Sequence, residues 1–198
     1  MDDLKNVKRV GNPELRRTQL LDVADRLFTE HGYYGVNLDD VAAEANVVRG
    51  TVLHYFGSKE GLYNAVLDRK GASLVALFKQ MSEDEFIEPA EAIKSFIRIS
   101  GKMSEQEKGM SSEYAGSEEK RFNFDTLRLK TYYRLTECIK KILEKGTQTG
   151  VWDIKNPELR AASLMFAIYG MSRADSTVEE MMDEMYDVAE KLLGVKIR

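Results

Sequence analysis

The sequence predicts an all-α fold, in which a three-helix helix-turn-helix domain is joined by a long helix to an antiparallel helical domain. Apolar residues recur at steps of three and four along most of the chain, which is the period of an amphipathic helix. No sustained alternation of apolar and polar residues, the pattern of a half-buried strand, interrupts that period. A longer helix followed by two short ones with a tight turn between them is the arrangement of a helix-turn-helix.

Composition places the chain among globular proteins. Its 198 residues are 43% apolar and 31% charged with three prolines, a balance typical of a folded protein. The longest uncharged run of the C-terminal half, residues 161–172, is shorter than the roughly 20 residues needed to cross a bilayer. One cysteine allows neither an internal disulfide nor a cysteine-based metal site. We therefore expect a cytoplasmic protein with no secretory signal, membrane span, metal or other cofactor.

The first two expected helices carry clear start and stop signals. The first begins at Pro13 and ends at Gly32, a residue that commonly follows a helix. Asn37 and Asp40 have the spacing of a capping box, so a second helix of about nine residues is expected to begin there. The buried stripe of the first helix consists of Leu20, Val23, Ala24, Leu27 and Phe28.

A tight turn and two further helices follow. Asn46 tolerates a left-handed backbone conformation, so we expect it to form the turn before a third helix over Val48–Phe56. Gly57 ends that helix, and Ser58 can cap a fourth over Lys59–Met81. The fourth helix, at about 23 residues and roughly 35 Å, is long enough to connect two parts of the molecule.

The second half of the chain is less regular. The acidic block Ser82–Pro89 breaks the helical period, and the polar segment Lys102–Phe124 is expected to form loops or frayed helices. A stronger helix is indicated by the stripe from Leu127 to Leu143, and it is expected to end near Gly146 to Gly150.

Two last helices are indicated by their caps. Asn156 followed by Pro157 marks the start of a helix that continues to Met171. Ser176 and Glu179 have the spacing of a capping box for a final helix with a methionine-rich stripe.

The composition of the third helix favours a nucleic-acid partner over a core position. Arg49 can reach guanine acceptors or a phosphate, Gly50 permits close approach of the backbone, and Thr51 offers a hydroxyl and a methyl group. Tyr55 and Lys59 are placed to hold the phosphate backbone. Because the net charge is −4, only a local basic face, and not the whole domain, can attract DNA.

Residues Arg17–Lys70 resemble the DNA-binding region of the tetracycline-repressor (TetR) family. The resemblance includes Phe28 and Gly32 in helix one, Val41-Ala42 in helix two, Gly50-Thr51, Tyr55-Phe56, and Ser58-Lys59-Glu60 followed by Leu62. It implies an all-α homodimer, in most members a repressor, whose variable C-terminal domain binds a small molecule. The implied organisation is an N-terminal arm over 1–12, a DNA-binding domain over 13–60, and a ligand-binding and dimerisation domain over 61–198.

Two positions depart from the family pattern. Asn46 replaces the usual turn glycine, and Leu53 replaces an aromatic residue that commonly touches DNA. A leucine can contact a thymine methyl group but donates no hydrogen bond, so base preference there is expected to differ. Tyr55 is also compatible with a core position. The residues expected at a double-stranded operator are Arg16, Arg17, Asn37, Arg49, Gly50, Thr51, Leu53, His54, Tyr55 and Lys59.

Candidate residues of the C-terminal domain follow from residue type and helix position. The aromatic and methionine groups expected to bind a largely apolar or aromatic effector are Met103, Met110, Tyr114, Tyr132, Phe166 and Tyr169. The residues expected in a homodimer interface of two helices from each chain are Leu164, Ile168, Met171, Met181, Met182 and Met185. The methionine stripe also fits core packing, and Cys138 is expected to be a buried, inert thiol.

Enzyme readings have little support in the sequence. It contains no Ser-His-Asp spacing, no glycine-rich phosphate loop and no HExxH motif, and it has two histidines. We therefore expect a ligand-released repressor and no catalysis. The alternatives are a helical module that binds a protein partner and a DNA-binding regulator without an effector.

Overall fold

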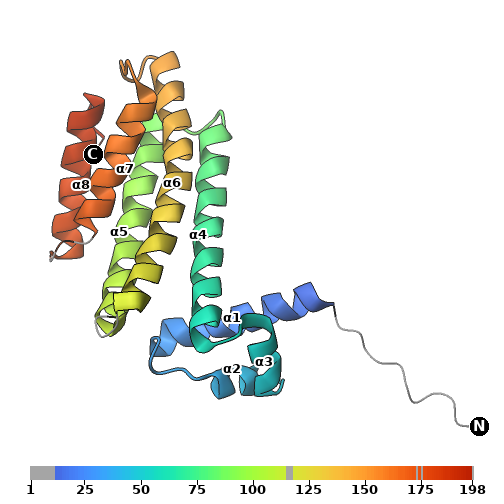
Figure 1. The fold of residues 1–198 in the computed structure, drawn as a ribbon. Coiled ribbons are helices and arrows are strands. Elements are labelled where there is room, and N and C mark those ends of the chain that lie inside the picture. Colours follow the sequence, from blue (N-terminus) through green and yellow to red (C-terminus); the bar gives the residue numbers. More distant parts are fainter. Residues whose placement is uncertain (1–11, 115–117, 173, 175, 198) are drawn as a thin grey trace, which may run out of the picture. The chain divides into compact units, whose positions relative to one another are not determined.

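The computed structural model describes residues 12–114, 118–172, 174 and 176–197, and within 104–124 it describes the backbone alone. The described residues form eight helices and no strand, which confirms the all-α prediction. The chain divides into two compact units, Met1–Leu67 and Asp68–Arg198. The helices are α1 (Pro13–His31), α2 (Leu38–Glu44), α3 (Arg49–Phe56), α4 (Lys59–Glu83), α5 (Pro89–Tyr114), α6 (Glu118–Gln148), α7 (Pro157–Met171) and α8 (Val178–Leu193) (Figure 1).

The first unit contains α1, α2, α3 and the start of α4 around one apolar core. The predicted stripe of α1 supplies Leu20, Ala24 and Phe28 to that core, and the ring of Phe28 packs edge-on against Tyr63 of α4. The side chain of Val52 is the part of α3 that is fully buried. One buried position in two turns anchors α3 and leaves the rest of its surface for other contacts.

Caps and turns of the first unit agree closely with the sequence. Asn37 and Asp40 form the expected capping box, although α2 has seven residues and not about nine. Asn46 has a φ of 52°, the left-handed conformation predicted for the turn. The third helix starts one residue later than predicted because Val48 is extended and serves as the N-cap. Gly57, with a φ of 74°, ends α3.

Helix α4 begins in the first unit and ends in the second. The amide of Gly61 donates to the Oγ of Ser58 at 2.9 Å, as expected for a cap. We placed the domain boundary after Glu60, whereas the structure divides the chain after Leu67. The first turns of α4 belong to the first unit because Leu62, Tyr63 and Val66 are buried in its core.

The second unit is a bundle in which α5 packs against α6 and α8, and α7 also packs against α6 and α8 (Figure 1). Helix α5 was not indicated by the sequence pattern, and loops or frayed helices were expected over Lys102–Phe124; the structure favours helices over loops there. The backbone there is helical up to Tyr114 and again from Glu118. The missed signal was the stripe of Ile93, Phe96 and Ile97, which are fully buried against the bundle.

Three close approaches hold the second unit together. The rings of Phe78 in α4 and Phe96 in α5 meet edge-on with centroids 5.0 Å apart. The indole of Trp152 lies against Gly146 and donates to the carbonyl of Leu143 at 2.7 Å. The first contact joins the end of α4 to the start of α5, and the other two hold the segment after α6 against the end of α6.

The start of α8 corrects one capping prediction. Thr177, and not Ser176, is the N-cap, and its partner in the capping box is Glu180 rather than Glu179. Both pairs have the same spacing, so the sequence pattern alone does not separate them. The described part of the chain contains no helix with the length and apolar character that crossing a membrane requires.

Candidate nucleic-acid interface

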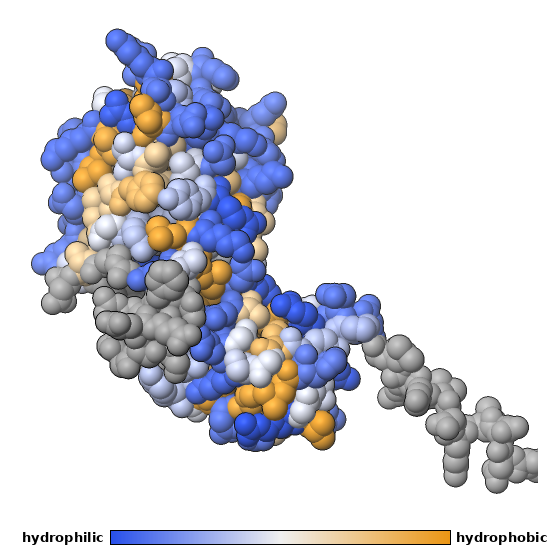
Figure 2. Space-filling view, in the orientation of Figure 1, coloured by the Kyte–Doolittle hydropathy of each residue, from blue (hydrophilic) through white to orange (hydrophobic). Residues whose placement is uncertain are grey.

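The outward surface of α3 brings together half of the residues predicted to touch DNA. Arg49, Gly50, Leu53 and His54 are exposed, and Thr51 is half-buried. These five positions all lie on the helix that follows the Asn46 turn, which is the recognition helix of a helix-turn-helix. Figure 2 shows apolar groups gathered in patches within the hydrophilic surface of each unit.

Arg49 is held by a partner that sequence reasoning did not identify. Its Nη1 donates to a carboxylate oxygen of Asp39 at 2.8 Å, and both side chains are exposed. Asp39 lies in the first turn of α2, so the ion pair connects the two helices of the motif. The carboxylate orients the guanidinium and neutralises its charge, which favours a directed contact over a general attraction to phosphates.

Gly50 and Val48 define an open surface at the start of α3. A Cβ atom at Gly50 would have no protein atom within 4 Å, so the chain itself does not require a glycine there. Val48, which we did not predict as a site residue, is 72% exposed and makes no capping hydrogen bond. An apolar residue at a position that favours Ser or Asn was the signal for it.

Three further predicted contact residues lie on α1 and at the start of α2. Arg17 lies with its guanidinium carbon 5.4 Å from the ring centroid of Phe56, which ties α1 to α3. Arg16 donates to Gln19 at 2.9 Å on the surface of α1. The amide oxygen of Asn37 accepts from the backbone of Asp39 at 2.8 Å, so this side chain serves as a cap.

Lys59 and the aromatic residues form a second group. The ammonium of Lys59 lies 4.3 Å from the ring centroid of Tyr33, a cation–π contact. Burial, followed by the Glu60 carboxylate and Tyr34, raises the pKa of the Tyr33 phenol. The ring that the Lys59 ammonium contacts is therefore that of a neutral phenol. Tyr55 is half-buried with its ring 5.4 Å from that of His54, a position between the core and the exposed face.

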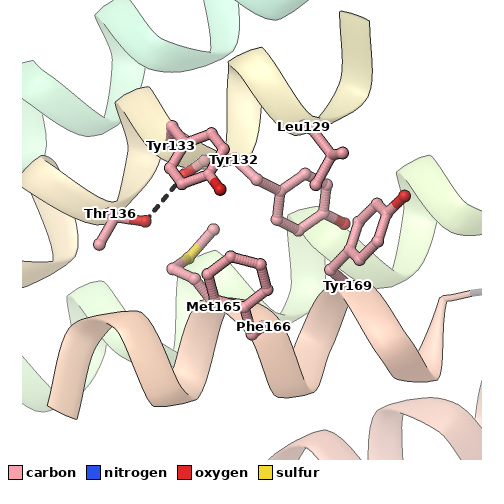
Figure 3. A pocket seen from close by; sticks show the side chains of 7 residues that line it. All are labelled: Leu129, Tyr132, Tyr133, Thr136, Met165, Phe166 and Tyr169. Carbon is pink, nitrogen blue, oxygen red and sulfur yellow. Dashed lines mark hydrogen bonds between the residues drawn. The ribbon is translucent and has the colours of Figure 1, made fainter. Parts of the chain in front are cut away.

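A separate groove lies between α6 and α7 in the second unit (Figure 3). Three residues predicted for effector binding, Tyr132, Phe166 and Tyr169, are brought together there. Two edge-on ring pairs build it: Tyr132 with Tyr169 at 5.1 Å and Tyr133 with Phe166 at 5.9 Å. Its lining residues are Leu129, Tyr132, Tyr133, Thr136, Met165, Phe166 and Tyr169. The enclosed space is about 10 Å³, which is room for one water molecule.

One other described effector candidate does not line the groove. Met103 is half-buried on α5 and does not line it. The side chains of Met110 and Tyr114 lie outside the described residues. Of the four effector candidates with described side chains, Tyr132, Phe166 and Tyr169 therefore share one surface.

Most of the residues proposed for the dimer interface are covered within a single chain. Leu164, Ile168, Met181 and Met185 belong to the core of the second unit. Their apolar side chains already fill the space between helices, so they have almost no exposed surface to offer a second chain. Met171 and Met182 are half-buried, and Met182 lies against Gly101 of α5. The apolar groups that α7 leaves exposed are Leu159 and Phe166.

Cys138 has the environment of a structural thiol. It is buried in the second unit, and its Sγ lies 3.8 Å from the carbonyl of Arg134. Burial raises the pKa of the Cys138 thiol, with the nearby Lys141 acting weakly in the opposite direction. A protonated, covered thiol is a poor nucleophile.

Comparison with known proteins identifies the first unit. Residues 20–66 match the family described as bacterial regulatory proteins, tetR family. The transcriptional regulator BetI of Burkholderia cenocepacia is 46% identical over 59 residues, which cover 30% of this chain and 30% of BetI. The chain thus matches less than a third of the length of this curated relative, and the match is confined to one segment.

Solved structures resemble the chain over most of its length. The reduced form of E. coli NemR has a TM-score of 0.61 at 19% identity, covering 87% of this chain and 95% of NemR. A regulator of the TetR/AcrR family from Thermobifida fusca has a TM-score of 0.61 at 23% identity, covering 90% and 96%. At these identities the likeness establishes a shared fold.

Proposed function

We propose that the chain is a sequence-specific DNA-binding regulator of transcription of the TetR family, because residues 20–66 match the bacterial regulatory proteins of that family and a segment of 59 residues resembles BetI. The observation that carries the proposal is the exposed face of α3, which is anchored by the buried Val52 and presents Arg49, Gly50 and Leu53 outward. A short helix with one buried position and an open glycine fits the major groove of duplex DNA.

The contacts divide into base reading and backbone positioning. Arg49, held by Asp39, is oriented for guanine acceptors, while Thr51 and His54 can donate to neighbouring base edges. Arg16, Arg17 and Lys59 surround the helix and would hold phosphates. Lys59 would leave or share its place on the Tyr33 ring to reach a phosphate.

We propose a homodimer as the DNA-binding form. Two recognition helices separated by about 34–36 Å would read half-sites one helical turn apart on a pseudo-palindrome. Most of the residues that the sequence predicted for the dimer interface are buried in the core of one chain. The dimer surface that we propose is therefore the exposed side of α7, with Leu159, Ser163 and Phe166. The half-buried Met171 and Met182 would lie at its margin.

An effector would bind at the aromatic groove between α6 and α7. The space found there admits one water molecule, so a larger ligand would have to displace the exposed rings of Tyr133 and Phe166. The lining is aromatic and apolar, which favours an effector of the same character. Tyr132 and Tyr169 would then stack against it.

We propose that the effector acts on the DNA-binding unit through the packing of α6 on α4. Thr131, beside Tyr132, packs on Gly71 of α4, and α4 continues into the first unit. A ligand that favours a shifted α6 would therefore move α4. A coupling free energy of about 1–3 kcal/mol would weaken operator binding about 5- to 150-fold, enough to release a repressor.

Anisotropy titrations across salt test the DNA-binding function. The purified chain first selects its site from random duplexes, and log affinity for that site should fall linearly with log salt concentration. Arg49→Ala should lose about 1–3 kcal/mol on the selected site. Flat salt dependence with no selected site would instead favour the helical module that binds a protein partner. In a separate experiment, aromatic compounds are added to the complex of protein and operator. Release of the DNA, followed by anisotropy, would show that an effector acts on this protein.

A further inference from the structure

We propose that the exposed face of α3 selects its operator through thymine methyl groups, which Val48 and Leu53 contact. This inference rests on the proposed DNA-binding function and names the base feature that the site recognises. It requires two aliphatic side chains that are exposed, firmly placed and free of a structural role in the chain itself.

Val48 meets these conditions because it lacks the polar side chain that caps four other helices of the chain. The N-caps Asn12, Asn37, Asn156 and Thr177 all accept backbone hydrogen bonds through their side chains. Val48 cannot accept one, and 72% of its surface is open to solvent. A locally unfavourable residue at an exposed position of a helix start indicates a requirement from outside the chain.

Leu53 provides the second aliphatic group. It is 37% exposed, whereas its neighbour Val52 is fully buried and fixes the rotation of α3. The open space at Gly50 leaves the surface between the two aliphatic residues unobstructed by the chain. The helix carries no acidic residue, so nothing on α3 repels the phosphates that flank a groove.

The pairing of Arg49 with Asp39 makes the aliphatic groups more important for recognition. A guanidinium that is already neutralised attracts phosphates less than a free one does. In the major groove, thymine presents an O4 acceptor and a C5-methyl group, and only the methyl group matches an aliphatic side chain. The inferred operator half-site therefore places thymines beneath the start and the middle of α3.

Uracil substitution tests the inference directly. Deoxyuridine keeps the hydrogen-bonding groups of thymidine and lacks the methyl group, so dT-to-dU changes at single positions of the selected duplex isolate the methyl contact. Loss of one buried methyl group should weaken binding about fourfold, and two such positions are expected in each half-site. Substitution at other thymines should leave the affinity unchanged.

Two variants assign the contacts to side chains. Val48→Ser replaces the valine with a better N-cap, so α3 should remain folded, and it should abolish the dU penalty at one position. Leu53→Ser should abolish the penalty at the other position. Phe86→Ser removes an apolar side chain that is 96% exposed in the second unit, and it should retain both penalties.

The outcomes separate this inference from the proposed function. Equal affinity for thymine and uracil at every position would overturn the methyl contacts while salt-dependent binding still supports a DNA-binding protein. A full dU penalty in both serine variants would also overturn the assignment to Val48 and Leu53. Absence of any selected, salt-dependent site would overturn the proposed function itself.

Discussion

At the scale of single residues, the candidate DNA-binding surface depends on a few side chains whose environment differs from that of their neighbours. Arg49 illustrates the point, because sequence pattern identified it as a base-reading residue but not its partner Asp39. The pair is ten residues apart in the chain, beyond the reach of any helical spacing rule. It forms because the Asn46 turn brings the start of α3 beside the start of α2.

Removing the carboxylate tests the role of that pair. Asp39→Asn frees the guanidinium of Arg49, so affinity for random duplex should rise by about two- to fivefold, the range of an exposed ion pair. The ratio of specific to random affinity should fall. Asp22→Asn makes the same charge change on α1 and serves as the control in the same anisotropy titrations. An unchanged ratio in Asp39→Asn would contradict the orienting role.

Cys138 gives a prediction about reactivity. Burial raises the pKa of its thiol, so at neutral pH the group is protonated and covered. Iodoacetamide should alkylate the folded protein far more slowly than the protein in denaturant, as followed by mass spectrometry. Equal rates in both states would show that the thiol is accessible.

At the scale of elements, two glycines of the bundle differ in whether a neighbouring side chain fills the space where a Cβ atom would lie. A Cβ atom on Gly146 would overlap the indole of Trp152, whereas one on Gly170 of α7 would meet no atom within 4 Å. Gly146→Ala should therefore cost about 1–3 kcal/mol of unfolding free energy through overpacking. Gly170→Ala should stabilise by up to about 1 kcal/mol. Chemical denaturation measures both, and destabilisation of equal size would refute the packing argument.

Lys145 is a second element-scale test, because it closes the turn between α4 and α5. Its ammonium donates to the carbonyls of Asp84 at 2.8 Å, Glu85 at 3.2 Å and Ile87 at 2.6 Å. Lys145→Met leaves these acceptors without that donor and should cost about 1.5–3 kcal/mol. Lys191→Met breaks an exposed pair with Asp187 that solvent screens, so it should change the stability less than Lys145→Met does. A smaller loss for Lys145→Met than for Lys191→Met in thermal unfolding would be contrary to this expectation.

At the scale of the whole molecule, one substitution should disrupt the proposed dimer without unfolding the chain. Leu159 is exposed on α7 and contributes nothing to the core, so Leu159→Asp should leave the helical content unchanged. It should shift the sedimentation coefficient from dimer to monomer and weaken operator binding at least tenfold, because two half-sites are no longer linked. Leu77→Asp, on the exposed side of α4, is the matched control. A dimer that persists in Leu159→Asp would place the interface elsewhere.

The sequence by itself determined the helical class, the helix-turn-helix and most of its caps, because these depend on residues within a few positions of one another. The Asn46 turn, the Asn37 and Asp40 capping box, and the Ser58 cap are local features of this kind. The composition of the third helix predicted a DNA-binding role for it, and the family resemblance added the expected homodimer and effector-binding domain.

Only the tertiary structure decided which apolar side chains are core and which are surface. The residues proposed for the dimer, such as Leu164 and Met185, fit both readings in sequence and proved to be buried within one chain. The Asp39–Arg49 pair, the exposure of Val48 and the meeting of Tyr132 with Tyr169 also required the packed helices. The reason is physical: periodicity states which face of a helix is apolar, while the neighbour that covers this face comes from a distant part of the chain.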